Sequence, residues 1–100
     1  MVVLHFATNE LRRCYEESER AIRHWGPQVG RRYIQRIEIL HAIKEFSEIF
    51  QFRSLHAHPL RGSRRGQYAI TLTGQWRLIV TKGDTESDVS VQEVSRHYGD

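Results

Sequence analysis

A change of hydrophobic period near the middle of the chain constrains the fold most strongly. In the first half, apolar residues such as Leu11, Cys14 and Ile22 recur at three- and four-residue steps, which is the spacing along one face of a helix. In the second half the apolar residues alternate with polar ones, as in Tyr68 and Ile70. A helical half followed by a strand half predicts an α+β fold.

The helical half divides at a glycine–proline pair. A short strand at residues 2–6 precedes one amphipathic helix over residues 9–25. Gly26 and Pro27 end this helix and start a second one, because glycine suits a helix exit and proline suits a first helical turn. The apolar stripe of the second helix is broad, and a short apolar turn at residues 46–52 follows it.

Three strands are predicted in the second half, at residues 66–73, 75–82 and 89–94. Gly74 separates the first two, which therefore form a hairpin. A chain of 100 residues fits one compact domain, so residues 1–100 are predicted to form a single domain. The predicted fold has two layers, in which the N-terminal strand and two helices pack on a C-terminal antiparallel three-strand meander.

Composition excludes several classes of protein. No apolar run approaches the roughly 20 residues of a membrane-spanning helix, and the N-terminus does not read as a secretory signal, so a cytoplasmic location without membrane contact is expected. Cys14 is the single cysteine, which excludes an intramolecular disulfide and a thiol zinc site. His56 and His58 lack further ligands nearby, and no glycine-rich phosphate fingerprint occurs. We therefore expect neither a metal nor a small-molecule cofactor.

The formal net charge of +3 conceals a cationic block. Residues 51–82 hold six basic and no acidic side chains, whereas residues 83–100 hold one basic and five acidic. The loop at residues 53–66 carries Arg53, Arg61, Arg64 and Arg65. Such a block attracts polyanions, and arginine matches phosphate oxygens, which favours RNA as the ligand; a solvated basic loop is the alternative. The acidic turn at residues 84–88 either folds back on this loop or only keeps a turn soluble.

Two further side chains suit chemistry on a phosphate. Alternation places Arg77 on the strand face opposite Trp76, where it is either an exposed arginine paired with a carboxylate or a fixed guanidinium for a developing charge. His97 near the C-terminus is either a plain surface residue or a proton donor and acceptor. Tyr98 beside it either stacks a base or caps the hydrophobic layer.

The segment 58-HPLRGSRRGQYAITLTGQWRLIV-80, together with 91-VQEVSRHY-98, resembles the HigB-type toxins of the RelE/ParE superfamily. The resemblance lies in the order His-Pro-Leu-basic-Gly, Arg-Gly-Gln-aromatic and Gln-Trp-Arg, and it covers about the last half of the chain. It implies a bacterial type II toxin that cleaves mRNA in the ribosomal A site. It also implies a small helix-turn-helix antitoxin, similar to HigA, as the protein partner.

The resemblance also implies the site residues. His58, Arg61, Arg77 and His97 match its catalytic positions. Cleavage then proceeds by attack of the ribose 2′-hydroxyl on the adjacent phosphate, with Arg77 and Arg61 stabilising the charge and His97 or His58 exchanging protons. The residues expected to contact RNA or phosphate are Arg53, Arg64, Arg65, Arg96 and Tyr98. Family members often end in Asp-Tyr-His, whereas Ser95 and Arg96 precede His97 here.

Two other functions remain open at this point. The first is a ParE-like inhibitor that binds DNA gyrase and performs no RNA chemistry, since one fold supports both activities. The second is a non-catalytic relative that binds an antitoxin or RNA, for which Ser95 and Arg96 are the motivating residues. The combination of histidines and arginines favours RNA cleavage, because a gyrase inhibitor needs no proton-transfer group.

The cationic block makes a prediction about salt. Activity should fall with added salt and with neutralisation of Arg61, Arg64 or Arg65, because counterion release drives binding to a polyanion. Removal of as many positive charges from residues 10–48, measured in the same RNA-binding and cleavage assays, should matter much less. Equal losses from the two sets of variants would show that only net charge matters.

Overall fold

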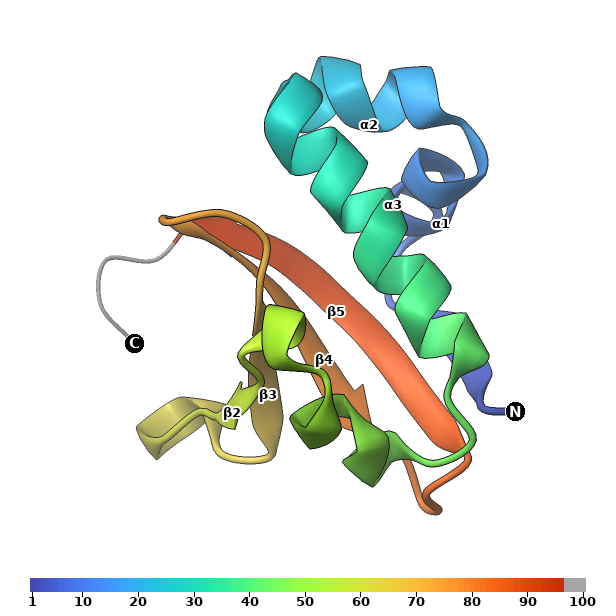
Figure 1. The fold of residues 1–100 in the computed structure, drawn as a ribbon, viewed down its shortest axis with the longest axis vertical. Coiled ribbons are helices and arrows are strands. Elements are labelled where there is room, and N and C mark those ends of the chain that lie inside the picture. The colour runs from blue at the N-terminus through green and yellow to red at the C-terminus, as the bar shows by residue number, and fades with distance from the viewer. Residues whose placement is uncertain (97–100) are drawn as a thin grey trace.

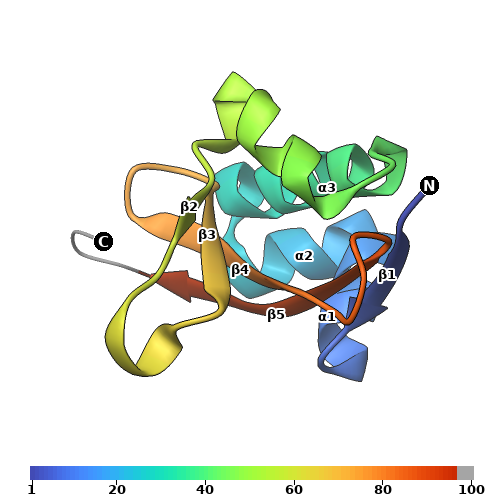
Figure 2. The same ribbon diagram turned by 90° about the horizontal axis from the view of Figure 1, so that it is seen from below.

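The computed structural model, which describes residues 1–96, contains a five-stranded sheet with the helices on one of its faces (Figures 1 and 2). The strand order is β1-β5-β4-β3-β2. The predicted two-layer α+β fold is thereby confirmed. Its helices are α1 (Asn9–Glu16), α2 (Ser18–Trp25) and α3 (Pro27–Ala42); its strands are β1 (Val3–Phe6), β2 (His58–Pro59), β3 (Gln67–Thr71), β4 (Trp76–Lys82) and β5 (Asp88–Arg96); its 3₁₀ turns are η1 (Phe46–Gln51), η2 (Arg53–Leu55) and η3 (Gly62–Arg64).

The predicted meander is present, and two edge strands extend it. β3 pairs with β4 and β4 with β5, both antiparallel, as the alternating pattern predicts. β1 pairs with β5 in parallel, with Phe6 opposite Val91. On the other edge β2 pairs with β3, which places His58 opposite Ala69. The sequence pattern missed β2 because a two-residue strand is too short to show a period.

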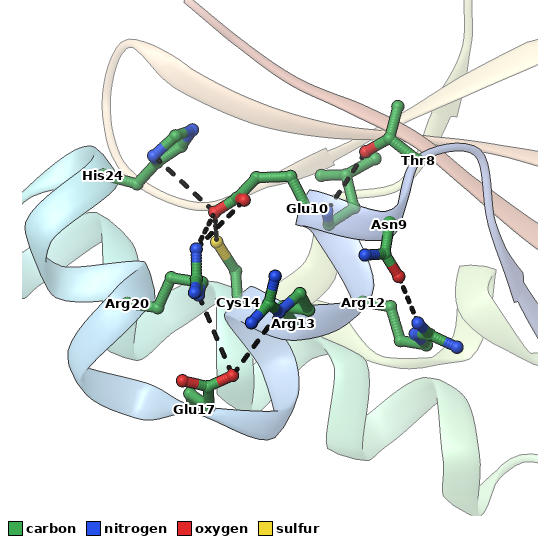
Figure 3. A network of polar contacts seen from close by, with 10 residues as sticks. Thr8, Asn9, Glu10, Arg12, Arg13, Cys14, Glu17, Arg20 and His24 are labelled. Carbon is green, nitrogen blue, oxygen red and sulfur yellow. Dashed lines mark hydrogen bonds and ion pairs between the residues drawn. The ribbon is translucent and has the colours of Figure 1, made fainter.

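The prediction of one helix over residues 9–25 is wrong, because the helix breaks at Glu17. Its backbone is extended, with φ −124° and ψ 99°, and α2 begins at Ser18. In one continuous helix, residues 10 and 20 would lie about 15 Å apart along the axis. The break instead brings Arg20 Nη1 to 3.2 Å from Glu10 Oε1, and Arg20 Nε to 3.8 Å from Glu17 (Figure 3).

This network also contains the buried cysteine. Cys14 Sγ donates to Glu10 Oε2 at 3.4 Å, and His24 Nδ1 lies 4.0 Å from the same oxygen (Figure 3). Burial, together with the neighbouring Glu10 carboxylate, raises the pKa of the Cys14 thiol to about 11. Burial acts to raise the pKa of Glu10, but hydrogen bonds from Cys14 and Arg20 outweigh it and the pKa is lowered. Cys14 is therefore an unreactive core thiol, as its place on the apolar stripe predicts.

The apolar stripe of α3 packs against the inner face of the sheet. Tyr33, Ile37 and Leu40 are fully buried, as are Leu78 and Val80 on β4. The Tyr33 hydroxyl donates to the carbonyl of Leu11 at 2.6 Å. The buried Tyr33 hydroxyl therefore has a partner where α3 meets α1. Within residues 1–96, no helix is long and apolar enough to cross a membrane.

The acidic turn before β5 contacts η1. The amide of Phe46 donates to the carbonyl of Glu86 at 2.8 Å, and the amide of Ser47 donates to its carboxylate at 2.9 Å. The hydrogen bond from the Ser47 backbone amide to the Glu86 carboxylate is the main reason that the pKa of Glu86 is lowered. Lys82 Nζ lies 3.5 Å from the same side chain. Glu86 therefore links the β4–β5 turn to η1, which is the apolar turn predicted at residues 46–52.

Gly30 allows α2 and α3 to approach closely. A Cβ atom at this position would lie 2.9 Å from the backbone of Ala21 and Ile22, which neither helix can accommodate without moving. We expect Gly30→Ala to lower the free energy of unfolding by about 1 to 3 kcal/mol, measured by chemical denaturation, despite the better helix propensity of alanine. Gly74→Ala is the matched control, because nothing lies within 4 Å of its Cβ position.

Candidate nucleic-acid interface

The sheet face that points away from the helices collects most of the predicted site residues. Leu78 and Val80 of β4 point into the core, so the alternate residues of β4 point to the opposite side. The registers extend this assignment across the sheet. We call this surface the open face; it comprises His58, Gln67, Ala69, Thr71, Arg77, Ile79, Thr81, Glu93 and Ser95.

One row across the open face begins with His58. It lies opposite Ala69, which lies opposite Ile79, which in turn lies opposite Glu93. Neighbouring strands are about 4.8 Å apart, so β2 and β5 are separated by about 14 Å. His58 is partly exposed, and its Nδ1 lies 3.1 Å from the carbonyl oxygen of His56. This contact turns the imidazole toward its own loop at the edge of the sheet.

The neighbouring row contains Arg77, between Thr71 and Ser95. Arg77 therefore projects on the side predicted by alternation, opposite Leu78. Its Nη1 donates to the carbonyls of Thr73 at 2.7 Å and Trp76 at 3.1 Å, which fixes the guanidinium at the β3–β4 turn. A guanidinium held in this way is preorganised, so little side-chain entropy is lost when it meets an anion.

Arg64 reaches the open face from the β2–β3 connection. Its Nη2 lies 3.0 Å from Glu93 Oε2. Figure 2 shows this connection in yellow at the lower left, away from the helices. Arg61 and Arg65 are exposed on the same connection. The structure therefore brings three arginines of the cationic block to the side of the sheet that carries His58 and Arg77.

Other predicted site residues lie elsewhere. Arg96 is opposite Trp76 in the register, which places it on the sheet face opposite that of Arg77, and its Nε and Nη2 donate to Gln75 Oε1 at 3.1 and 2.7 Å. Arg53 is exposed in η2, away from the β2–β3 connection. His97 and Tyr98 lie outside the described residues, so their predicted roles stay predictions.

Arg36 on α3 positions two segments of the site. Its side chain is 6% exposed, and burial lowers its pKa from the ordinary guanidinium value. Nε donates to the carbonyl of Thr71 at 3.0 Å, and Nη2 donates to the carbonyl of Ser54 at 3.2 Å. Thr71 is the cross-strand partner of Arg77, and Ser54 lies in the turn that leads to His58. One buried cation therefore ties both segments to α3.

Sequence reasoning missed Arg36 and Glu93. Arg36 lies three residues after Tyr33 and four before Leu40, on an otherwise apolar stripe, and that position was the only available signal of its burial. Glu93 lies outside the cationic block in the sequence and reaches it only through strand pairing. Among residues 1–96, no three His, Cys, Asp or Glu side chains lie close enough together to hold a metal ion.

Solved structures similar to this one include bacterial toxins. Neither a protein-family model nor a curated protein sequence matches the chain. A YoeB/ParE toxin from Agrobacterium tumefaciens has a TM-score of 0.59 and 18% identity, over 98% of this chain and 100% of that one. A YoeB–YefM complex from Staphylococcus aureus has a TM-score of 0.55 and 15% identity, over 98% and 99%. The RelBE2 toxin–antitoxin complex from Mycobacterium tuberculosis has a TM-score of 0.54 and 19% identity, over 96% and 98%.

The chain has the fold of these toxins. The RelE/ParE type of fold implied by the sequence resemblance is thereby confirmed. At 15 to 19% identity, the likeness to the toxin fold extends to the architecture alone, and a specific match to HigB stays a prediction. Function must therefore be argued from the residues of the open face.

The position of Arg36 leads to a prediction about stability. Arg36→Met keeps the aliphatic stem but removes both donors, so the carbonyls of Thr71 and Ser54 lose their partner. We expect the free energy of unfolding to fall by about 2 to 3 kcal/mol, measured by chemical denaturation. Arg31→Met removes an exposed guanidinium from the same helix and should change it by less than about 0.5 kcal/mol. Equal effects would contradict the assignment.

Proposed function

We propose that the protein is the toxin of a bacterial type II toxin–antitoxin system and inhibits translation by cleaving mRNA on the ribosome. The observation that carries the proposal is the open face, on which a partly exposed imidazole and a preorganised guanidinium lie beside three arginines of the cationic block. The fold shared with YoeB and RelBE toxins supports the same reading.

The chemistry follows from the side chains available. The 2′-oxygen of a ribose attacks the adjacent phosphorus as it loses its proton, the bond to the 5′-oxygen breaks, and that oxygen takes up a proton. The products are a 2′,3′-cyclic phosphate and a 5′-hydroxyl. His58 and His97 are the proposed proton-transfer groups, and Arg77 and Arg61 stabilise the additional negative charge on the phosphate. All four roles use protein side chains.

Arg77 suits its role because its position does not depend on the ligand. Two strand spacings, about 10 Å, separate the backbone of β4 from that of β2, so Arg77 and His58 belong to the same sheet face two strands apart. The hydrogen bonds to Thr73 and Trp76 hold the guanidinium in place before RNA arrives. Electrostatic stabilisation is strongest when the donor needs no reorganisation at the moment of reaction.

The proposed protein partner is an antitoxin. Two of the similar structures, from Staphylococcus aureus and Mycobacterium tuberculosis, are toxin–antitoxin complexes. The sequence resemblance implies a small helix-turn-helix antitoxin similar to HigA. An antitoxin that binds the β2–β3 connection would have to offer acidic side chains to Arg61 and Arg65, which are both exposed.

The proposal is tested by adding the purified protein to ribosomes that translate a defined mRNA and, in parallel, to a gyrase supercoiling assay. We expect cleaved mRNA and unchanged supercoiling. Arg77→Ala should lower the cleavage rate about 100-fold or more, because one fixed electrostatic donor is lost, and should leave antitoxin binding nearly intact.

Arg31→Ala is the matched control, because it removes one exposed guanidinium from the helical side and should leave cleavage within about twofold. Thermal unfolding of each variant confirms that it is folded. Intact mRNA with blocked supercoiling would replace the proposal by gyrase inhibition, and intact mRNA with normal supercoiling would indicate a non-catalytic binding protein. Full cleavage by folded Arg77→Ala would remove Arg77 from the catalytic residues.

A further inference from the structure

An ion pair spans the open face and covers part of it. Arg64 Nη2 lies 3.0 Å from Glu93 Oε2, and the two side chains are 35% and 43% exposed. Because β3 and β4 separate β2 from β5, the Arg64 side chain passes over the sheet to reach Glu93. Ala69 and Ile79 of the same row are fully buried, although they point away from the helices. The ion pair thus joins the β2–β3 connection to β5 on the open face.

The guanidinium of Arg64 is only partly satisfied in this arrangement. Its Nη1 is buried and has no hydrogen-bond acceptor among residues 1–96. The Glu93 carboxylate contacts Nη2 alone, so the second arm of the planar fork is unused. A phosphate group presents several oxygens and can accept from both arms at once. Exchange of Glu93 for a phosphate would therefore satisfy a donor that the ion pair leaves without an acceptor.

Charge around the pair favours the same exchange. Arg61 and Arg65 flank Arg64 on the β2–β3 connection, and both are exposed. Residues 51–82 contribute no carboxylate of their own, so Glu93 is supplied to Arg64 from a strand outside this block. A polyanion can contact all three arginines, whereas Glu93 contacts one. Counterion release from several arginines outweighs a single, partly exposed ion pair.

We propose that Glu93 occupies the phosphate-binding guanidinium of Arg64 while RNA is absent, and that an RNA backbone phosphate displaces it. The displaced pair uncovers the row between His58 and Glu93, where the sugar and phosphate of the substrate then lie. This inference rests on the proposed function, because it assigns the substrate contact of Arg64 and the way that contact is regulated. Glu93 is thus an internal competitor for a polyanion and lowers the affinity of the resting protein for RNA.

The test is a double-mutant cycle on RNA binding. The probe is a fluorescent single-stranded RNA with 2′-O-methyl riboses, which cannot be cleaved, and binding is measured by anisotropy at low, fixed salt. Glu93→Gln should bind this RNA about 2- to 5-fold more tightly than wild type, the range that release of a partly exposed ion pair allows. Arg64→Ala should bind it more weakly.

The decisive measurement is Glu93→Gln in the Arg64→Ala background. In that background we expect Glu93→Gln to tighten RNA binding no more than Glu38→Gln does. Glu38→Gln removes one carboxylate from the exposed side of α3, so it measures the effect of net charge alone. Thermal unfolding confirms that each variant is folded. The same tightening with and without Arg64 would overturn the inference, because the effect would then be a long-range charge effect.

The outcomes separate this inference from the proposed function. Wild-type protein that neither binds the RNA probe nor cleaves mRNA on ribosomes would remove the proposed function, and the inference with it. Wild-type protein that binds the probe and cleaves mRNA, but shows no coupling between Arg64 and Glu93, would remove the inference alone. Tighter RNA binding by Glu93→Gln only when Arg64 is present would support the inference.

Discussion

The buried guanidinium of Arg36 is the contact on which the geometry of the open face depends. A cation in this position is tolerated only because the carbonyls of Thr71 and Ser54 accept its hydrogen bonds. These acceptors lie 35 and 18 residues from Arg36 in the sequence, in two segments that this side chain joins to α3. Loss of either contact would leave a buried charge partly unsatisfied, so α3 holds the end of β3 and the approach to β2 in one arrangement.

The two faces of the sheet carry different kinds of residues, although these residues alternate along the sequence. Apolar residues of β4 such as Leu78 and Val80 face the helices and exclude water, and the alternate residues Arg77 and Ile79 face the other way. The cationic block is therefore not one surface. Arg61, Arg64 and Arg65 gather beside the open face, whereas the register assigns Arg96 to the side of Trp76. The sum of charges along the chain says less about RNA binding than the face on which each charge lies.

This chain shares its fold with toxins to which it is only 15 to 19% identical in sequence. A two-layer packing of helices on a sheet needs only apolar residues at the right period, which many sequences satisfy. Chemistry on a phosphodiester needs particular groups at particular distances. For this reason the proposed activity rests on His58, Arg77 and the arginines of the β2–β3 connection, and the architecture serves to hold them.

The sequence by itself determined the elements whose pattern is local. The 3.6-residue period predicted α3, the alternation predicted β3, β4 and β5, and the residue types of the cationic block indicated a polyanion. The local pattern did not predict the break at Glu17, which brings Arg20 to Glu10. It also did not predict β2, which is too short to show a period.

Only the tertiary structure decided which distant residues meet. The parallel pairing of β1 with β5, the burial of Arg36 and the contact between Arg64 and Glu93 each join segments from different parts of the chain. The physical reason is that periodicity records how one segment faces the core, whereas strand order and register fix its neighbours. Glu93 therefore reads as one of several acids near the C-terminus in the sequence, and becomes the partner of the cationic block only once the sheet has formed.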